Sequence, residues 1–324
     1  MALKNYLAQR LLFFIFSFFI VLVLNFLIPR LLPGNPVTRF INPLMTPQVQ
    51  HQILAQFGLT KPLYVQFLLY IEGVFTGNFG VSFLYYPVSV GTVMAQRLPW
   101  TIFLVGSSTI ISTVIGIYLG LGSAWRAGSK ADTAAVLSSM AFRSIPTFWL
   151  GLILLIVFGV TLRLLPTSGY FTANFSETSS LASFLKSVVS HSILPIATLT
   201  AYLVGGNLLI MRAQSIETLR EDFVFALRAE GYDSGRILRG HVLKNAFLPM
   251  LTNIGIQMGY IASGAVLVET VFSYPGMGLL VYQAVLARDY PTLQGSFFVL
   301  TVFVLVAVLV SDLLYSVLDP RIRR

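Results

Sequence analysis

The chain has 324 residues, a mean hydropathy of +0.81 and only 10% charged residues, against roughly 25% in soluble domains. So few charges cannot cover a water-facing surface, and a chain this hydrophobic is not disordered, which leaves an integral membrane protein. The chain has no cysteine, which excludes disulfides, thiolate metal sites and a cysteine nucleophile.

Six apolar segments have about the length of a transmembrane helix, which needs roughly 20 mostly apolar residues. They cover residues 11–32, 101–124, 133–160, 192–212, 248–268 and 297–314. The first is too long for the apolar region of a signal peptide and no small-residue cleavage site follows it, so we expect it to be retained. Pro146 lies inside the third segment and predicts a kink there.

Positive charge gathers on one side of these six segments. The ends of the chain and the segments 125–132 and 213–247, with the adjoining Arg212, hold 13 of the 21 Lys and Arg residues. These are Lys4, Arg10, Arg126, Lys130, Arg212, Arg220, Arg228, Arg236, Arg239, Lys244, Arg321, Arg323 and Arg324. The positive-inside rule therefore predicts that both termini and the 213–247 segment are cytoplasmic. This asymmetry explains the basic net charge without a nucleic-acid partner.

The predicted external segment 33–100 is too long for a simple turn. Apolar residues at helical spacing predict a helix over residues 64–75, and the glycine-rich and aromatic stretch at 77–87 predicts a loop. Its aromatic side chains suit either the membrane interface or contact with a substrate.

Small residues mark two of the predicted spans. Gly116 and Gly120 stand four apart in the second, and Gly255, Gly259 and Gly264 lie in the fifth. Such residues let helices approach closely in lipid, either within one chain or between two chains.

The segment 213–247 is the only long predicted connection between spans on the cytoplasmic side. Ile216, Leu219, Phe223 and Ala226 recur at helical spacing and predict one amphipathic helix that ends at Gly231. Asp233 or Ser234 is expected to cap a further short helix, which Gly240 interrupts. The polar side chains carry both signs of charge, which favours docking to a soluble partner over lying on lipid, although both remain open.

No motif for chemistry on a substrate is present. A nucleotide-binding G-x-x-x-x-G-K-[ST] sequence is missing, and the three histidines His51, His191 and His241 lie on different predicted sides of the membrane. We therefore expect no catalytic residue and no metal site in this chain, and any ATP hydrolysis belongs to another polypeptide.

The stretch RAEGYDSGRILRGHVLKNAFLP at 228–249 resembles the cytoplasmic loop of ABC importer permeases, in the version of the first permease subunit of dipeptide, oligopeptide and nickel importers. Further matches follow in order along nearly the whole chain. They are RLLPGNPV at 30–37, GNFGVSF at 77–83, RLPWT at 97–101, SIPTFWLG at 144–151, LLPTSGY at 164–170, ETVFSYPGMG at 269–278, ARDYPTLQG at 287–295 and DLLYSVLDPRIR at 312–323.

The resemblance implies an all-α integral membrane protein with six transmembrane helices, the type I ABC importer permease fold and both termini cytoplasmic. It implies an N-terminal helix with an external segment at 1–96, a permease core at 97–318 and a cytoplasmic tail at 319–324. It implies a second homologous permease, two cytoplasmic ATPase subunits that bind ATP and magnesium, and an extracytoplasmic substrate-binding protein. This chain itself would hold no cofactor.

The resemblance also makes the 213–247 loop a coupling segment that sits in a cleft of the ATPase. Arg228, Ala229 and Gly231 match the family's core positions. Phe223 and Leu227 are the expected apolar anchors, although their partner can equally be the chain's own spans. The residues expected to couple are Phe223, Leu227, Arg228, Ala229, Gly231 and Arg236. The chain departs from the general pattern at residues 225–227 and at Lys244, as the peptide-importer subunit commonly does.

Further residues are expected in the translocation path or the external gate. Arg143 is costly inside a span, and it can meet a peptide carboxylate, pair within the bundle or reach the headgroups. The resemblance places the loop after the fifth span at the external gate, where Glu269 can pair with Arg288. The complete set is Arg143, Pro146, Glu269, Tyr274, Pro275, Arg288 and Asp289.

The expected substrate is a di- or oligopeptide delivered by the binding protein. Importers of oligosaccharides or nickel share the same pattern and stay open as alternatives. A stand-alone channel or secondary transporter would need carboxylates within the spans, which hold little besides Arg143. A purely structural or assembly protein would need no coupling loop at all.

Overall fold

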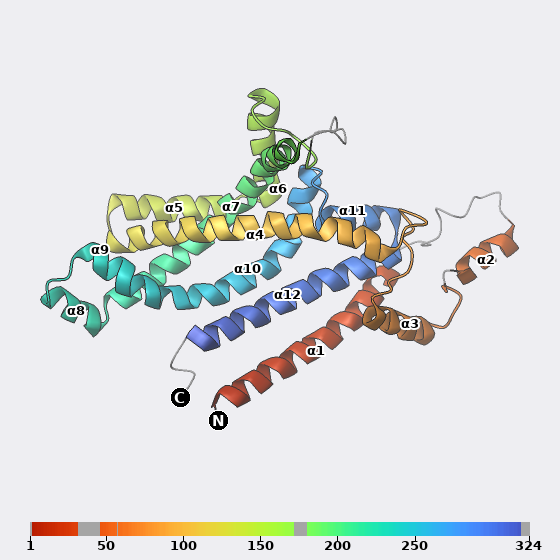
Figure 1. Ribbon diagram of the computed structural model, residues 1–324, viewed down its shortest axis with the longest axis horizontal. Helices are drawn as coiled ribbons and strands as arrows, with labels where there is room; N and C mark the ends of the chain where they lie inside the picture. Colours follow the sequence, from red (N-terminus) through yellow and green to blue (C-terminus); the bar gives the residue numbers. More distant parts are fainter. Residues whose placement is uncertain (1, 32–45, 57, 172–179, 319–324) are drawn as a thin grey trace. The chain divides into compact units, whose positions relative to one another are not determined.

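The computed structural model describes residues 2–31, 46–56, 58–171 and 180–318, and this part of the chain is all-helical apart from one isolated bridge between Val81 and Ser89. The motif at 30–37 lies largely outside the described residues, and the tail at 319–324 lies wholly outside them. The helices are α1 Ala2–Leu31, α2 Pro47–Gln56, α3 Leu63–Thr76, α4 Val90–Trp125, α5 Lys130–Ser144, α6 Thr147–Leu154, η1 Leu155–Thr161, α7 Leu181–Leu219, α8 Asp222–Ala229, α9 Ser234–Arg236, η2 Ile237–Val242, α10 Leu243–Val271, α11 Met277–Ala287 and α12 Tyr290–Leu318 (Figure 1).

Four helices of the described chain are long and apolar enough to cross a membrane: α1, α4, α7 and α12. The broken pair α5 with α6 and η1 makes a fifth if it forms one span. The remaining predicted span coincides with α10, whose 29 residues give about 44 Å at 1.5 Å per residue. Helix α10 is not among the helices counted above, so the count of six stays a prediction.

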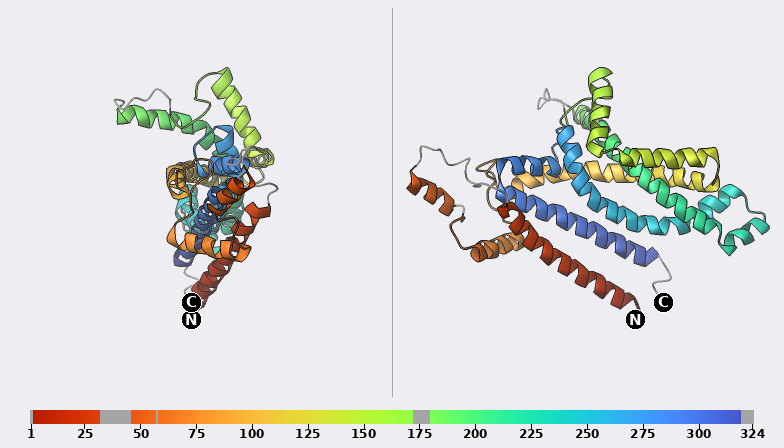
Figure 2. Two further views of the ribbon diagram at one scale, coloured as in Figure 1. Left: turned by 90° about the vertical axis from the view of Figure 1, so that its right-hand side faces the viewer. Right: turned by 180° about the vertical axis from the view of Figure 1, so that it is seen from behind.

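Pro146 breaks the third predicted span outright, where only a kink was expected. Ile145 has an extended backbone at φ −80° and ψ 126°, and the helix restarts at Thr147 with an axis bent by 97° (Figure 2). Proline lacks the N–H group and disfavours helical geometry in the residue before it. Pro195, in contrast, is accommodated inside the continuous helix α7.

The predicted external elements agree with the structure. The helix expected over residues 64–75 is α3, which ends at Gly77 in the left-handed conformation at φ +72°. The stretch 77–87 is non-helical, as its composition predicted. Helices α4, α7, α10 and α12 all extend several residues beyond the apolar segments that predicted them.

The described chain forms two compact units, of which the first contains residues 102–274 and the two ends of the chain. Helix α7 packs against α5 and α10 in this unit. It also meets α4 closely, because a Cβ atom added at Gly120 would lie 2.7 Å from the Met211 Cβ atom, and one added at Gly116 would overlap Asn207. These two glycines therefore serve packing within the chain.

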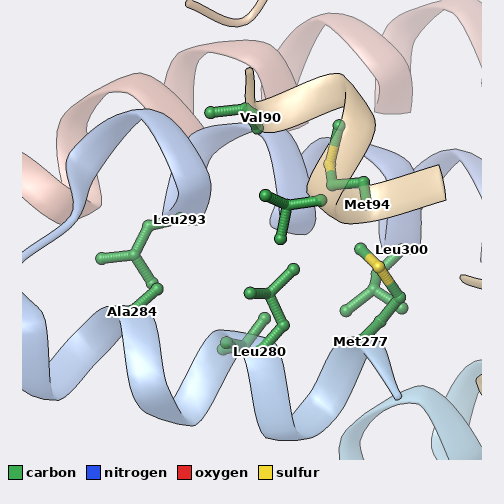
Figure 3. Close-up of a cluster of buried hydrophobic side chains, with 9 residues drawn as sticks. Val90, Met94, Met277, Leu280, Ala284, Leu293 and Leu300 are labelled. Carbon is green, nitrogen blue, oxygen red and sulfur yellow. The ribbon is translucent and has the colours of Figure 1, made fainter. Parts of the chain in front are cut away.

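The second unit contains residues 8–101 and 275–305. Its core joins the start of α4 to α11 and the start of α12 through a cluster of buried apolar side chains (Figure 3). The labelled members are Val90, Met94, Met277, Leu280, Ala284, Leu293 and Leu300. The Met277 N–H group also donates to the Thr101 hydroxyl at 2.7 Å, which fixes the start of α11 against α4.

Candidate functional site

Before Gly231, the predicted coupling segment is built from two helices where the sequence suggested one. Ile216 and Leu219 belong to the end of α7, whereas Phe223 and Ala226 belong to α8. The chain turns between them, because α7 ends at Arg220 and Glu221 is extended at φ −73° and ψ 148°. The prediction of a single amphipathic helix is therefore wrong. Spacing alone does not reveal this turn, because the apolar residues keep their helical spacing across it.

The turn chemistry of the segment is as predicted up to Asp233. Gly231 follows α8 at φ +81°, and the Tyr232 N–H group donates to the Leu227 carbonyl at 3.0 Å. The Asp233 carboxylate accepts from the Gly235 N–H group at 2.8 Å and so caps the next helix. The chain then stays helical to Val271 through a π-helical stretch, so the expected break at Gly240 is wrong.

Phe223 and Leu227 anchor α8 on the chain's own helices. Both side chains are half-buried and pack against the cluster that contains Leu121, Met211 and the almost fully buried Val224. The sequence left open whether these anchors face the ATPase or the chain itself, and the packing supports the second alternative. Nothing in the sequence singled out Val224.

The opposite face of α8 is open. Phe225 is 77% exposed, and Arg228, Ala229, Gly231 and Arg236 are exposed as well. The guanidinium carbon of Arg228 lies 5.5 Å from the centre of the Trp125 ring. A cavity of about 550 Å³ beside this contact is lined by residues that include Trp125, Arg220 and Arg228. This face combines an aromatic anchor with cations, which suits a protein partner.

A buried ion pair lies near this face, and nothing in the sequence identified it. The Arg212 Nε and Nη2 atoms donate to the two carboxylate oxygens of Asp132 at 2.6 and 2.7 Å. The same carboxylate accepts from the Ser123 hydroxyl and from the Gly128 N–H group. These bonds tie the turn between α4 and α5 to α7, one helix before the coupling segment.

Replacing Asp132 with asparagine is expected to destabilise the chain by about 3 kcal/mol, because Arg212 would keep a largely desolvated charge without its partner. Thermal unfolding of the purified protein in detergent measures the change. The control is Glu217→Gln, which alters an exposed acid on α7 and is expected to leave the melting temperature nearly unchanged. Equal melting temperatures for both variants would contradict this role of the pair.

Arg143 lies exposed at the end of α5, beside a buried polar cluster. A Cβ atom added at Gly206 of α7 would lie 3.9 Å from the Arg143 guanidinium carbon and 3.9 Å from the Gln257 amide nitrogen. Gln257 and Asn253 of α10 both donate to the side-chain oxygen of the fully buried Asn207. The two distances place the Arg143 guanidinium carbon within about 8 Å of the Gln257 amide nitrogen, next to this cluster of amide groups.

The predicted gate residues of the first unit surround the end of α10. Glu269 and Tyr274 are fully buried, and the Tyr274 N–H group donates to the Glu269 carbonyl at 2.8 Å. The Tyr274 hydroxyl lies 3.1 Å from that of Ser192 on α7. Burial raises the pKa of Tyr274 to about 12, so the hydroxyl stays protonated and its hydrogen bond ties the loop to α7.

Pro275, Arg288 and Asp289 belong to the second unit, so the predicted pairing of Glu269 with Arg288 stays a prediction. The buried Asp289 carboxylate caps α12 through the Thr292 N–H and hydroxyl groups. It also accepts from the Ser82 hydroxyl and the Leu84 N–H group, at 2.5 and 2.9 Å. Asp289 therefore fixes the loop that contains Ser82 and Leu84 onto the start of α12.

These features define a multi-span membrane protein with a broken span and an exposed helical connection. A solved structure titled "Inward facing conformations of the MetNI methionine ABC transporter" has the same fold, with a TM-score of 0.55, 17% identity, and coverage of 70% of this chain and 96% of that chain. The fold is that of a type I ABC importer permease.

Sequence comparison identifies the family. Residues 112–324 match the model of the binding-protein-dependent transport system inner membrane component, and residues 3–105 match the model of its N-terminal region. The chain belongs to this family of transport permeases. It is 34% identical to the dipeptide transport system permease protein DppB of Lactococcus lactis, over 98% of this chain and 99% of that one. It is 33% identical to the oligopeptide transport system permease protein AppB of Bacillus subtilis, over 93% and 94%.

Proposed function

We propose that this chain is one permease subunit of an ATP-driven importer of di- or oligopeptides in the inner membrane. The observation that carries the proposal is the similarity, over almost the full length, to permease proteins of dipeptide and oligopeptide transport systems.

The proposed topology has six transmembrane helices, with α10 as the fifth and α12 as the sixth. Both termini and the 213–247 segment face the cytoplasm, which the distribution of Lys and Arg supports. Residues 1–96 form the first span and an external segment, residues 97–318 the permease core, and residues 319–324 a cytoplasmic tail.

The proposed partners are a second homologous permease, two cytoplasmic ATPases and an extracytoplasmic binding protein. The ATPases bind ATP and magnesium, and this chain holds no cofactor. Because Phe223 and Leu227 pack against the chain's own helices, the outward face of α8 with Arg228 and Ala229 is left for the ATPase, together with Arg236 of α9.

The helical run from Ser234 to Val271 carries motion into the membrane in this proposal. It begins after Asp233 and leads past Gln257 to Glu269 without leaving helical geometry. When ATP draws the two ATPases together, a displaced α8 pulls on this run and so moves the polar cluster and the gate loop. The cavity then alternates between outward and inward access.

The proposal is tested by purifying the chain in mild detergent after expression from its own operon, and by measuring uptake in proteoliposomes with the co-purified subunits and ATP. We expect a second permease and Walker-containing ATPases in the complex and uptake of labelled di- or tripeptides. Uptake of oligosaccharides or nickel, with none of peptides, would overturn the substrate assignment. A lone chain after crosslinking would overturn the importer assignment.

Replacing Phe225 with alanine is expected to weaken binding of the ATPase by about tenfold, because aromatic anchors carry much of an interface's binding energy. The matched control is Phe75→Ala on α3, since Phe75 is 74% exposed and Phe225 77%. ATPase retained on the immobilised permease during a dilution series measures the effect. Equal retention by both variants would show that the exposed face of α8 is not the docking surface.

A further inference from the structure

The second unit contains a cavity of about 430 Å³, and the described residues that line it include one cation and no acid. Arg30 comes from the end of α1, Gln66 and Tyr70 from α3, Phe79 from the external loop and Gln294 from α12. Cavities of this size are typical of small-molecule sites, which combine apolar walls with a few fixed polar groups.

Arg30 is held rigidly at this cavity. Its Nε and Nη2 atoms donate to the Gln66 side-chain oxygen at 3.2 and 3.0 Å, and its Nη1 atom donates to the Phe26 carbonyl at 2.9 Å. The guanidinium carbon lies 3.6 Å from the centre of the Phe26 ring. Gln66 is itself fixed, because its amide nitrogen donates to the Lys61 carbonyl at 2.8 Å. The cation is therefore pre-organised, which reduces the entropy cost of binding a ligand.

Arg30 has no counter-charge among the described residues. It forms no ion pair within the described residues, and only three of the five N–H donors of a guanidinium are used there. A half-buried cation without an anion is costly unless a further group supplies the charge. All its bonds end on neutral oxygens, so these contacts position the guanidinium without neutralising it.

Gln294 adds an independent observation at the same cavity. Its side chain is about nine-tenths buried, and its amide nitrogen has no hydrogen-bond partner in the described part of the chain. Burying an unpaired polar group destabilises a protein unless a further group bonds to it. An unsatisfied donor and an unneutralised cation at one cavity both call for an acceptor that carries negative charge.

We propose that this cavity binds the carboxylate of a short peptide, with Arg30 and Gln294 as the donors and the aromatic wall around the neighbouring side chain. The proposal rests on the peptide-import function proposed above. In that topology the end of α1 and the start of α12 lie at the external surface, where the binding protein releases its ligand. Residues 30–86 also lie in the N-terminal region that matches a separate family model, apart from the permease core.

The test measures binding to the purified complex in phosphatidylcholine nanodiscs without ATP. The probes are radiolabelled Ala-Phe-Ala with a free carboxylate and the same peptide as its C-terminal amide. Arg30→Gln is expected to weaken binding of the acid about tenfold and to leave the amide unchanged, since only the acid needs the cation. Arg97→Gln in the same unit is the matched control and is expected to bind both peptides like the wild type.

Gln294→Glu guards against an Arg30 variant that fails to fold. The change keeps the side-chain size and places an acid inside the cavity, so it is expected to exclude the free acid about tenfold without weakening binding of the amide. Equal affinity of the wild type for acid and amide would overturn the proposal. The proposal would also be overturned if peptide binding were lost in phosphatidylglycerol nanodiscs and restored there by Arg30→Gln, because the cavity would then hold a lipid phosphate.

Uptake measured in parallel separates this proposal from the proposed function. Arg30-dependent binding of the free acid together with transport of another substrate class would leave the cavity assignment standing and overturn peptide import. Normal peptide uptake with no difference between acid and amide in the binding test would leave peptide import standing and overturn the cavity assignment.

Discussion

Replacing Gly231 with proline is expected to abolish ATP-dependent uptake while the chain remains inserted in the membrane. Gly231 has φ +81°, whereas proline fixes φ near −65°, so the turn between α8 and α9 must rearrange. The change would also alter the path to Tyr232, whose N–H group closes the end of α8. A misfit of about 3 kcal/mol in the turn between α8 and α9 corresponds to about a hundredfold loss of coupled transport.

The measurement compares ATP-driven peptide uptake with membrane insertion and with the rate of ATP hydrolysis by the assembled complex. Gly240→Ala is the control in the same segment, because an added Cβ atom there meets nothing within 4 Å and the backbone is already helical. We expect Gly240→Ala to transport normally and Gly231→Pro to hydrolyse ATP without uptake or to lose the ATPase. Normal uptake by Gly231→Pro would refute the assignment of 213–247 as the coupling segment.

Local chemistry made much of this segment predictable from the sequence. A glycine in the left-handed region and an aspartate that caps its own turn act through a few neighbouring residues, so Gly231 and Asp233 were identified correctly. The turn at Arg220 and Glu221 was missed, because Phe223 continues the apolar phase of Leu219 across it. Apolar runs likewise predicted long helices but not where they begin, because α4 and α7 both start well before the runs that predicted them.

Contacts between residues far apart in the chain could not be predicted from the sequence. Asp132 and Arg212 are 80 positions apart, and nothing in either neighbourhood signals that they meet. Arg30 was equally inconspicuous, because only the fold brings Gln66 and Gln294 to the same cavity. The exposure of single side chains could not be predicted from the sequence either. Phe225 and Val224 are adjacent apolar residues, and the docking of α8 leaves the first exposed and buries the second.

The second large effect is expected at Arg143, whose replacement by glutamate should reduce peptide uptake about a hundredfold. The guanidinium is exposed and forms no ion pair within the described residues, and its aliphatic part lies along Gly205, where an added Cβ atom would be 3.0 Å from the Arg143 Cγ atom. A larger residue on α7 would displace it, so the glycine surface keeps the cation beside Gln257. We propose that this cation lies in the translocation path, where a reversed charge would repel a peptide carboxylate by several kcal/mol.

Arg143→Lys separates charge from geometry, because it keeps the cation and should retain most of the uptake. Arg163→Glu reverses another exposed arginine of the same unit and should transport like the wild type. Co-purification of the ATPase with each variant controls for assembly. Normal uptake by Arg143→Glu would remove Arg143 from the path and assign it to the headgroups or to the contact with the second permease. A loss of uptake with intact assembly would instead identify the face of α5, α7 and α10 around Gly206 as the route that the substrate follows.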